Sequence, residues 1–404
     1  MSRRVFGLEP IFSNYILVMM AIVGLVVFFT IVKVTPAAAY SLIAMAIAAL
    51  VLLFMILKVM PIAAYAYPSA RVRVMKGKML GDNKLRELIE SMDYRDIIGS
   101  FEGTTYERFV AGKKELAEIE RGLALNLAHD YKAIRSMSPK KAEPFFRMLS
   151  ARYDIENIKA IMASKETGLA VSEFFPGPLS ESFLQKLIEA SSLDETIELL
   201  KATDYKEIAE SLEPNSSLKE YQRALDKFVY EELLKKRRIE EAARTAGVMQ
   251  DSQFLKKVYG MRVDIMNLKM ALRGVKSKLG LEKTKALMVK NGYFLTEKKL
   301  EAIAEASDVE SAVNTLDGTP YFTAVSDSAR ESEKLGSLHP LEKALDEYYL
   351  DKIRSFYLQQ PFGLTPIACY LALKEAEISN LRAILNGVKE GLPKEQIKSL
   401  VVGL

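Results

Sequence analysis

A six-residue pattern that occurs three times at nearly equal intervals constrains this 404-residue chain more than any other feature. Each copy reads acid, Ile, any residue, Asn, Ile or Leu, and base, and the asparagines of successive copies lie 110 and 113 residues apart. We call this pattern the hexad. Its acid, amide and base are Asp154, Asn157 and Lys159 in the first copy, Asp264, Asn267 and Lys269 in the second, and Glu377, Asn380 and Arg382 in the third. Self-similarity at a fixed period indicates that one supersecondary unit is repeated along the chain.

Three further features recur in a common order. A Leu followed by a small residue that suits a helix N-cap comes first, then a segment ending in Tyr, then a base, a small residue and Leu. The first feature occurs as Leu80-Gly81, Leu179-Ser180 and Leu295-Thr296. The second occurs as Met92-Asp93-Tyr94, Thr203-Asp204-Tyr205 and Thr319-Pro320-Tyr321. The third occurs as Arg121-Gly122-Leu123, Arg223-Ala224-Leu225-Asp226 and Lys343-Ala344-Leu345-Asp346. We therefore predict three homologous units of about 110 residues, at 65–175, 176–290 and 291–404.

Apolar periodicity from Tyr65 onward indicates helices throughout. Apolar residues recur three and four apart, as in KLRELIES and TIELLKA, and few stretches alternate with period two, so we predict an all-α fold. Asn is unfavourable inside a helix. Its recurrence at the same position of all three hexads therefore predicts a hydrogen bond to another helix. The hexad acid and base are not helical neighbours, so we expect their partners in another helix or in water. We interpret these residues as core-register and capping residues, with a binding role as the alternative.

The N-terminal part of the chain holds two long runs without charge, residues 11–32 and 34–57. A helix needs about 20 apolar residues to cross a bilayer core, so both runs are long enough. Because Pro36 interrupts the backbone between them, we predict a two-helix transmembrane hairpin over residues 1–64 that contacts lipid through residues 11–57. A twin-arginine export signal at Arg3-Arg4 is the competing interpretation, but the apolar run is longer than in such signals and a second run follows at once.

Flanking charges predict the orientation of this hairpin. Arg3 and Arg4 precede the first run, and Arg71, Arg73 and Lys76 follow the second. The positive-inside rule then places both ends, and the domain that follows, on the cytoplasmic side of the cell membrane. Residues 11–57 hold one base and no acid, so we expect the hairpin to anchor the chain without carrying ions. Residues 1–64 carry +3 of the formal charge of +4, and the near-neutral remainder argues against nucleic acid as a partner.

The chain lacks the motifs of common catalytic sites. One cysteine, Cys369, and two distant histidines, His129 and His339, exclude a disulfide framework and argue against a Cys- or His-rich metal centre. Gly112-Lys113-Lys114 lacks the first glycine and the hydroxyl residue of a P-loop, and no HExxH or GxSxG occurs. We expect Cys369 to be a small buried residue. No catalytic, cofactor-binding or metal-binding residue is assigned, and no cofactor is expected.

Segments at both ends of the helical part carry a resemblance to a known family. Residues 65–76 (YAYPSARVRVMK), 366–382 (PIACYLALKEAEISNLR) and 387–397 (GVKEGLPKEQI) resemble the C subunits of archaeal A-type ATP synthases, a family related to the d subunits of V-type ATPases. The resemblance covers residues 65–404. It implies an all-helical funnel of three similar units around a pseudo-threefold axis, without catalysis. It also implies a rotor component that joins central-shaft subunits to the membrane rotor ring and so couples ion flow to ATP synthesis or hydrolysis.

The N-terminal hairpin departs from this family, because its usual members begin near the position of Tyr65 and are peripheral. A membrane-anchored helical-repeat scaffold unrelated to ATP synthesis would show the same periodicity and therefore stays open. An enzyme with an unfamiliar site is the weakest alternative, because the sequence shows no convergent polar cluster. Co-purification with a rotor ring and shaft subunits would distinguish the rotor component from the scaffold.

Overall fold

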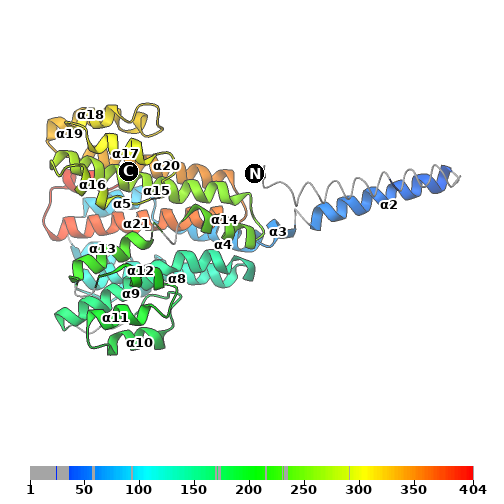
Figure 1. Ribbon diagram of the computed structural model, residues 1–404, viewed down its shortest axis with the longest axis horizontal. Helices are drawn as coiled ribbons and strands as arrows, with labels where there is room; N and C mark the ends of the chain where they lie inside the picture. The colour runs from blue at the N-terminus through cyan, green and yellow to red at the C-terminus, as the bar shows by residue number, and fades with distance from the viewer. Residues whose placement is uncertain are drawn as a thin grey trace. The chain divides into compact units, whose positions relative to one another are not determined.

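The computed structural model describes residues 24, 36–56, 60–91, 94–168, 171, 174–213, 216–229, 231, 235–290 and 292–403. The chain divides into two compact units, Met1–Ala63 and Ala64–Leu404 (Figure 1). Every element of secondary structure in these described residues is helical, which confirms the predicted all-α class.

The first unit contains α2 (Pro36–Phe54) and α3 (Met60–Ala63) among its described residues. Large apolar side chains of α2 are exposed, among them Tyr40, Met45 and Ile47. No helix in the described part of the chain combines the length and the apolar character needed to cross a bilayer. The first predicted span, residues 11–32, lies outside the described residues apart from Gly24. The predicted transmembrane hairpin therefore has no support from the described residues.

The second unit is built from helices of very different length. Its helices are α4 (Ala66–Gly77), α5 (Asp82–Glu90), α6 (Tyr94–Gly99), α7 (Glu107–Val110), α8 (Leu116–Met137), the 3-10 helix η2 (Lys140–Ala142), α9 (Glu143–Thr167), α10 (Glu181–Glu189), α11 (Leu193–Leu200), α12 (Lys206–Ser211), α13 (Leu218–Phe228), α14 (Lys236–Thr245), α15 (Asp251–Lys276), α16 (Leu281–Leu287), α17 (Glu297–Ala304), α18 (Val309–Asn314), α19 (Phe322–Leu335), α20 (His339–Gln359), α21 (Thr365–Lys389) and α22 (Lys394–Leu400). The three hexads lie on α9, α15 and α21, which have 25, 26 and 25 residues.

Local sequence explains where several of these helices begin and end. The side chains of Ser180 and Thr296 accept the backbone N–H of the third residue of α10 and α17, as the expected N-caps do. Gly81 occupies the corresponding position of α5 and offers no side-chain acceptor. Helix α9 ends at Thr167, and the Gly168 that follows has a φ of 71°, in the left-handed region that glycine adopts without strain.

Three apolar cores hold the described part of the second unit together. One lies among residues 151–228 and another among residues 265–345. The third combines residues 65–153, 239–261 and 350–401, so the two ends of this unit share one core. Helix α9 passes from the shared core at Tyr153 to the next core at Ile155, and α15 does the same between Met261 and Ile265. The long helices therefore connect the cores.

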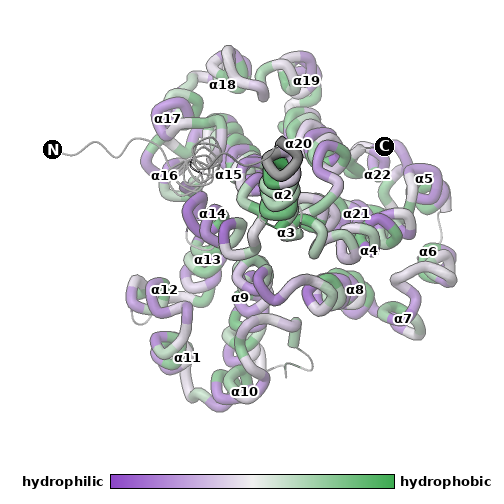
Figure 2. The backbone as a smooth tube through the Cα atoms, turned by 90° about the vertical axis from the view of Figure 1, so that its right-hand side faces the viewer, coloured by the Kyte–Doolittle hydropathy of each residue, from purple (hydrophilic) through white to green (hydrophobic). Residues whose placement is uncertain are grey.

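The short helices form separate groups around the long ones. Figure 2 shows α10–α12 on one side of the second unit, α17–α19 on another and α5–α7 on a third. Helices α9, α15 and α21 lie between these groups (Figure 2). This arrangement brings one face of each hexad helix toward the middle of the unit and another toward its own group of short helices.

Candidate functional site

The hexad acids of α9 and α15 each hold the start of a short helix and a tyrosine. The carboxylate of Asp154 accepts hydrogen bonds from the backbone N–H of Leu179, at 3.0 Å, and from the hydroxyl of Tyr205, at 2.7 Å. Asp264 accepts from the N–H of Phe294, at 2.7 Å, from the N–H groups of its two neighbours, and from the hydroxyl of Tyr321, at 2.8 Å. Both carboxylates are fully buried.

Burial also raises the pKa of both acids. It raises the pKa of Asp154 to about 6, against the opposing effect of the hydrogen bonds from Tyr205 and Leu179. The pKa of Asp264 is raised for the same reason, again against the hydrogen bonds that it accepts. Burial, together with the nearby carboxylate, raises the pKa of both tyrosines. These tyrosines therefore remain neutral hydrogen-bond donors.

The third hexad acid makes the same kind of contact with the beginning of the second unit. Glu377 accepts from the backbone N–H of Leu80 and from the hydroxyl of Tyr106, and it also pairs with Lys374 at 2.8 Å. The recurring order of features aligns Tyr94 with Tyr205 and Tyr321, but in this copy the tyrosine that contacts the hexad acid is Tyr106. An equal spacing of 26 residues joins Leu80 to Tyr106, Leu179 to Tyr205 and Leu295 to Tyr321, and this spacing is the signal in the sequence that could have identified Tyr106.

Each hexad asparagine pairs with both polar groups of one peptide residue. The side-chain amide of Asn157 donates to the carbonyl of Phe175 and accepts from its N–H, both at 2.8 Å. Asn267 makes the same two bonds to Val289, at 2.7 and 2.8 Å, and Asn380 to Val402, at 2.9 and 3.0 Å. The predicted partner was another helix. The structure corrects this, because Phe175, Val289 and Val402 lie in non-helical segments whose peptide groups have no helical partner.

The hexad bases differ among the three copies. Lys159 pairs with Asp226 on α13 at 2.8 Å, and Lys269 pairs with Asp346 on α20 at 2.6 Å, so both reach another helix as expected. Arg382 instead donates to the backbone carbonyl of Glu120, at 3.4 Å. Within the described residues Arg382 has no salt bridge, and its Nε is buried without a hydrogen-bond partner.

A cluster of three charged residues joins the three hexad helices. Glu375 on α21 forms salt bridges with Arg152 on α9 and with Arg262 on α15. Each of these residues stands two positions before its hexad acid. Burial opposes ionisation of Glu375, but the two guanidinium groups outweigh it and lower its pKa to about 2. We call these three residues the charged triad.

Members of the charged triad line cavities. One, of about 410 Å³, is lined by residues that include Ala124, Asp226, Arg382 and all three members of the triad. Another, of about 340 Å³, is lined by Arg262, Lys269, Asp346 and Glu375, among others. The charged triad and two of the hexad bases, Lys269 and Arg382, thus line cavities, whereas the hexad acids and asparagines are buried in contacts that hold the fold.

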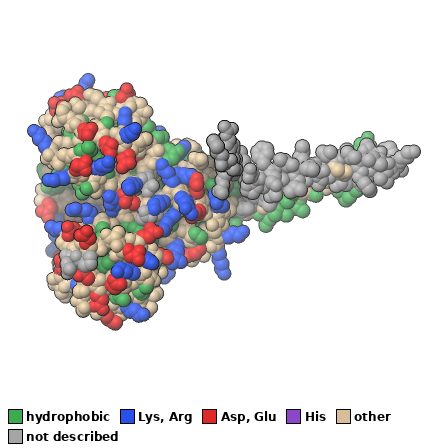
Figure 3. Space-filling model, in the orientation of Figure 1, with side chains coloured by type: hydrophobic (Ala, Val, Ile, Leu, Met, Phe, Trp, Pro, Cys, Tyr) green, Lys and Arg blue, Asp and Glu red, His purple; other side chains and the backbone are tan. Residues whose placement is uncertain are grey.

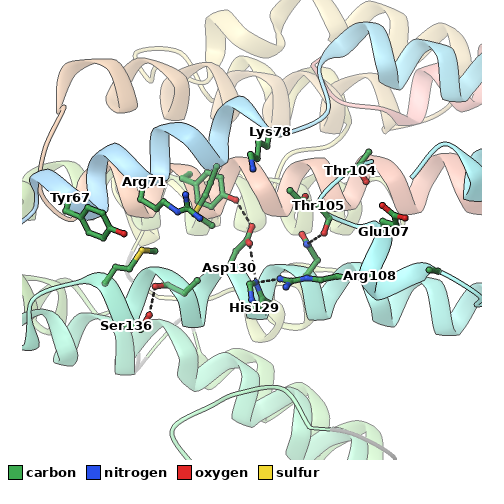
Figure 4. A pocket seen from close by; sticks show the side chains of 16 residues that line it. Tyr67, Arg71, Lys78, Thr104, Thr105, Glu107, Arg108, His129, Asp130 and Ser136 are labelled. Carbon is green, nitrogen blue, oxygen red and sulfur yellow. Dashed lines mark hydrogen bonds and ion pairs between the residues drawn. The ribbon is translucent and has the colours of Figure 1, made fainter. Parts of the chain in front are cut away.

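A larger groove of about 790 Å³ runs between α4 and α8 (Figure 4). Arg71 from α4, Arg108 from α7 and His129 from α8 line it, and Arg108 contacts Nδ1 of His129 at 2.6 Å. Asp130 accepts from the hydroxyl of Tyr370 at 2.5 Å. The Arg108–His129 and Tyr370–Asp130 contacts thus lie between residues that line this groove.

The remaining candidate chemistry is limited. Cys369 is fully buried, as expected, and burial raises the pKa of its thiol, so it is not a thiolate nucleophile. No three His, Cys, Asp or Glu side chains in the described part of the chain lie close enough together to hold a metal ion. On the visible face of the second unit, charged side chains of both signs are interspersed (Figure 3). The polar contacts described above hold helices of the chain together.

The sequence is similar to those of known proteins. The sequence pattern of the ATP synthase (C/AC39) subunit family matches residues 68–400. The chain belongs to this family.

Curated relatives are similar over most of their own length. The C subunit of the A-type ATP synthase of Methanocaldococcus jannaschii is 31% identical over 352 residues, which cover 84% of this chain and 86% of the relative. The protein of the same name from Methanothermobacter thermautotrophicus is 30% identical, with 83% and 87% covered, and that from Thermococcus onnurineus is 29% identical, with 83% and 89% covered. The C/AC39 match includes all three hexads and the charged triad, whereas residues 1–67 lie outside it.

Proposed function

We propose that this chain is a non-catalytic rotor subunit of an A/V-type ATP synthase that adapts the central shaft to the membrane rotor ring. In this role it transmits torque and thereby couples ion flow to ATP synthesis or hydrolysis. The observation that carries the proposal is the C/AC39 family match over residues 68–400, combined with relatives named as the C subunits of A-type ATP synthases. The polar side chains of the hexads support a mechanical role, since they hold helix starts and loops.

Native purification tests this proposal. An affinity tag at the C-terminus of the full chain, followed by detergent extraction and mass spectrometry of the intact complex, should recover ring and central-stalk subunits together in stoichiometric amounts. A matched preparation with the same tag on an unrelated membrane protein measures background. Recovery of the chain with neither group of subunits contradicts the proposal and favours a membrane-anchored helical-repeat scaffold unrelated to ATP synthesis.

We further propose that the three hexads mark three related units of the second unit of the chain, predicted at 65–175, 176–290 and 291–404. Three equivalent sets of hydrogen bonds support this proposal: a hexad acid to a helix start and a tyrosine, and a hexad asparagine to one peptide residue. The third set involves Leu80 and Tyr106. Each set of hydrogen bonds joins two of these units: the hexad acid of one unit holds the helix start and the tyrosine of the next. The acid of the last unit, Glu377, holds the first unit in the same way.

Residues 11–57 are proposed to contact membrane lipid and to hold the second unit at the cytoplasmic side of the cell membrane. Support comes from the two runs without charge and from the basic residues that flank them. Partition of a fusion of residues 1–64 with a soluble reporter tests this: the fusion should remain in the membrane pellet after carbonate extraction. Release of the fusion into the supernatant contradicts the proposal.

A further inference from the structure

The three hexad bases occupy equivalent positions but are not equally neutralised. Lys159 and Lys269 each meet an aspartate, Asp226 and Asp346, on the helix that packs beside the hexad helix. Both aspartates follow the recurring base-small-Leu segment directly. In the remaining copy this segment is Arg121-Gly122-Leu123, and the next residue is Ala124. The carboxylate that neutralises the hexad base in two copies is therefore absent from the third.

Arg382 faces the place where this carboxylate is missing. It lines the cavity of about 410 Å³ together with Ala124. Its guanidinium donates to the Glu120 carbonyl at 3.4 Å, which is a long hydrogen bond, and its Nε has no partner in the described structure. The Glu120 carboxylate accepts from Asn386 at 2.7 Å instead. A buried guanidinium nitrogen without an acceptor is costly, so this position is suited to an incoming acceptor.

The other two copies indicate which acceptor fits. In both copies the base meets a carboxylate from the neighbouring helix, Asp226 for Lys159 and Asp346 for Lys269, and Lys159 also meets Glu156 at 3.2 Å. Glu156, Asp226 and Glu375 also line the cavity, and they disfavour a multiply charged anion such as phosphate. A lone carboxylate adds one negative charge next to Arg382 and can accept two parallel hydrogen bonds from a guanidinium.

We infer that Arg382 and the adjoining cavity beside Ala124 receive an acidic side chain of a central-stalk partner. This inference rests on the proposed function, which supplies the central shaft as a partner. Two of the three equivalent bases, Lys159 and Lys269, are already neutralised within the chain. Of the three similar orientations in which the partner could dock, only one therefore places its acidic side chain beside a base that has no carboxylate partner among the described residues. The partner is thereby held in one rotational register, which a torque-transmitting contact requires.

The substitution Ala124→Asp tests the inference directly, because it supplies the missing carboxylate from within the chain. The full chain in detergent micelles is titrated with the purified central-stalk subunits of the same organism, and Kd is measured by calorimetry at low and moderate salt. We expect Ala124→Asp to bind about tenfold more weakly than the unsubstituted chain, with a smaller dependence on salt. Its melting temperature should be equal or higher, since the new pair is intramolecular.

Ala124→Asn is the matched control, because it has the shape of the aspartate without its charge. It should bind within about twofold of the unsubstituted chain. Equal weakening by Ala124→Asn and Ala124→Asp indicates a steric effect and overturns the inference, as does full affinity of Ala124→Asp. Should Ala124→Asp not fold, Arg382→Gln replaces it, with the exposed Arg330→Gln on α19 as control. Absence of any binding between the unsubstituted chain and the stalk proteins contradicts the proposed function itself, which distinguishes that failure from the present one.

Discussion

Hexad asparagines act through pairs of hydrogen bonds to a single peptide residue. Asn267 is 1% exposed and satisfies both the N–H and the carbonyl of Val289. Asn267→Leu removes both partners, and each buried peptide group left unsatisfied costs about 1–3 kcal/mol. We therefore expect a clear loss in the free energy of unfolding, measured by denaturant titration of the full chain in detergent. The interpretation of these asparagines as structural residues predicts this loss without a selective loss of partner binding.

Asn314→Leu provides the control for this substitution. Asn314 is exposed at the end of α18, and the same chemical change there should alter the free energy of unfolding by no more than about 0.5 kcal/mol. Equal effects at the two positions, or an unchanged stability of Asn267→Leu together with lost partner binding, contradict the structural role.

The buried carboxyl of Asp154 should make stability depend on pH. Its pKa is about 6 in the folded chain, above its ordinary value of 3.8, so the folded chain binds a proton more tightly than the unfolded chain. Its contribution to stability is fully present below about pH 4 and is lost as the pH rises through about 6, with a magnitude of about 2–3 kcal/mol.

Comparison with Asp154→Asn isolates this contribution from those of other groups. Unfolding of both chains is measured between pH 4 and 7.5, and the difference in free energy of unfolding is plotted against pH. The unsubstituted chain should lose stability relative to the variant between pH 4 and 6, and the difference should be constant above about pH 7. A difference that does not vary with pH contradicts the raised pKa.

At the scale of elements, the charged triad links three long helices through one carboxylate. Glu375→Gln removes the carboxylate that bridges Arg152 on α9 and Arg262 on α15. Loss of a fully buried pair costs about 3–5 kcal/mol. The two arginine side chains are 28% and 33% exposed, so solvent screening reduces the expected loss to about 2 kcal/mol.

An exposed ion pair serves as the comparison for this substitution. Arg147 and Asp204 are 59% and 60% exposed and form a salt bridge at 2.7 Å, so Asp204→Asn should cost less than about 1 kcal/mol. Thermal unfolding of the three chains at low and high salt distinguishes the sites. If Glu375→Gln and Asp204→Asn have the same effect, the triad does not hold the hexad helices together.

For the whole molecule, the structure predicts that the second unit folds without the first. Residues 64–404 form a compact unit that contains all three apolar cores. A fragment of residues 65–404 should therefore unfold cooperatively and remain monodisperse without detergent, as judged by circular dichroism and size-exclusion chromatography. Aggregation of this fragment under conditions where the full chain in detergent is monodisperse contradicts the prediction.

Some contacts of the hexads could be predicted from sequence and others could not. The salt bridges of Lys159 and Lys269 with another helix follow from the expectation that a base without a helical neighbour finds a distant partner. The alignment of Tyr94 with Tyr205 and Tyr321 did not identify the tyrosine that contacts Glu377, because short segments resemble one another by chance; an equal spacing from the preceding Leu identifies Tyr106. The partners of the asparagines were unexpected because a hydrogen bond to a peptide group in a loop produces no pattern of apolar residues in the sequence.

Periodicity and spacing were enough to predict the helices that the described residues form and the N-caps at Ser180 and Thr296, and three short segments carried the resemblance to the family, because all of these depend on residues close together in sequence. Contacts across the fold required the coordinates. A repeat has no intrinsic phase, so the sequence could not show that Glu377 near the end of the chain holds Leu80 near its beginning. Nor could it show that Glu375 lies between Arg152 and Arg262, because hydrogen bonds and ion pairs form between whichever groups the packing of distant helices brings together.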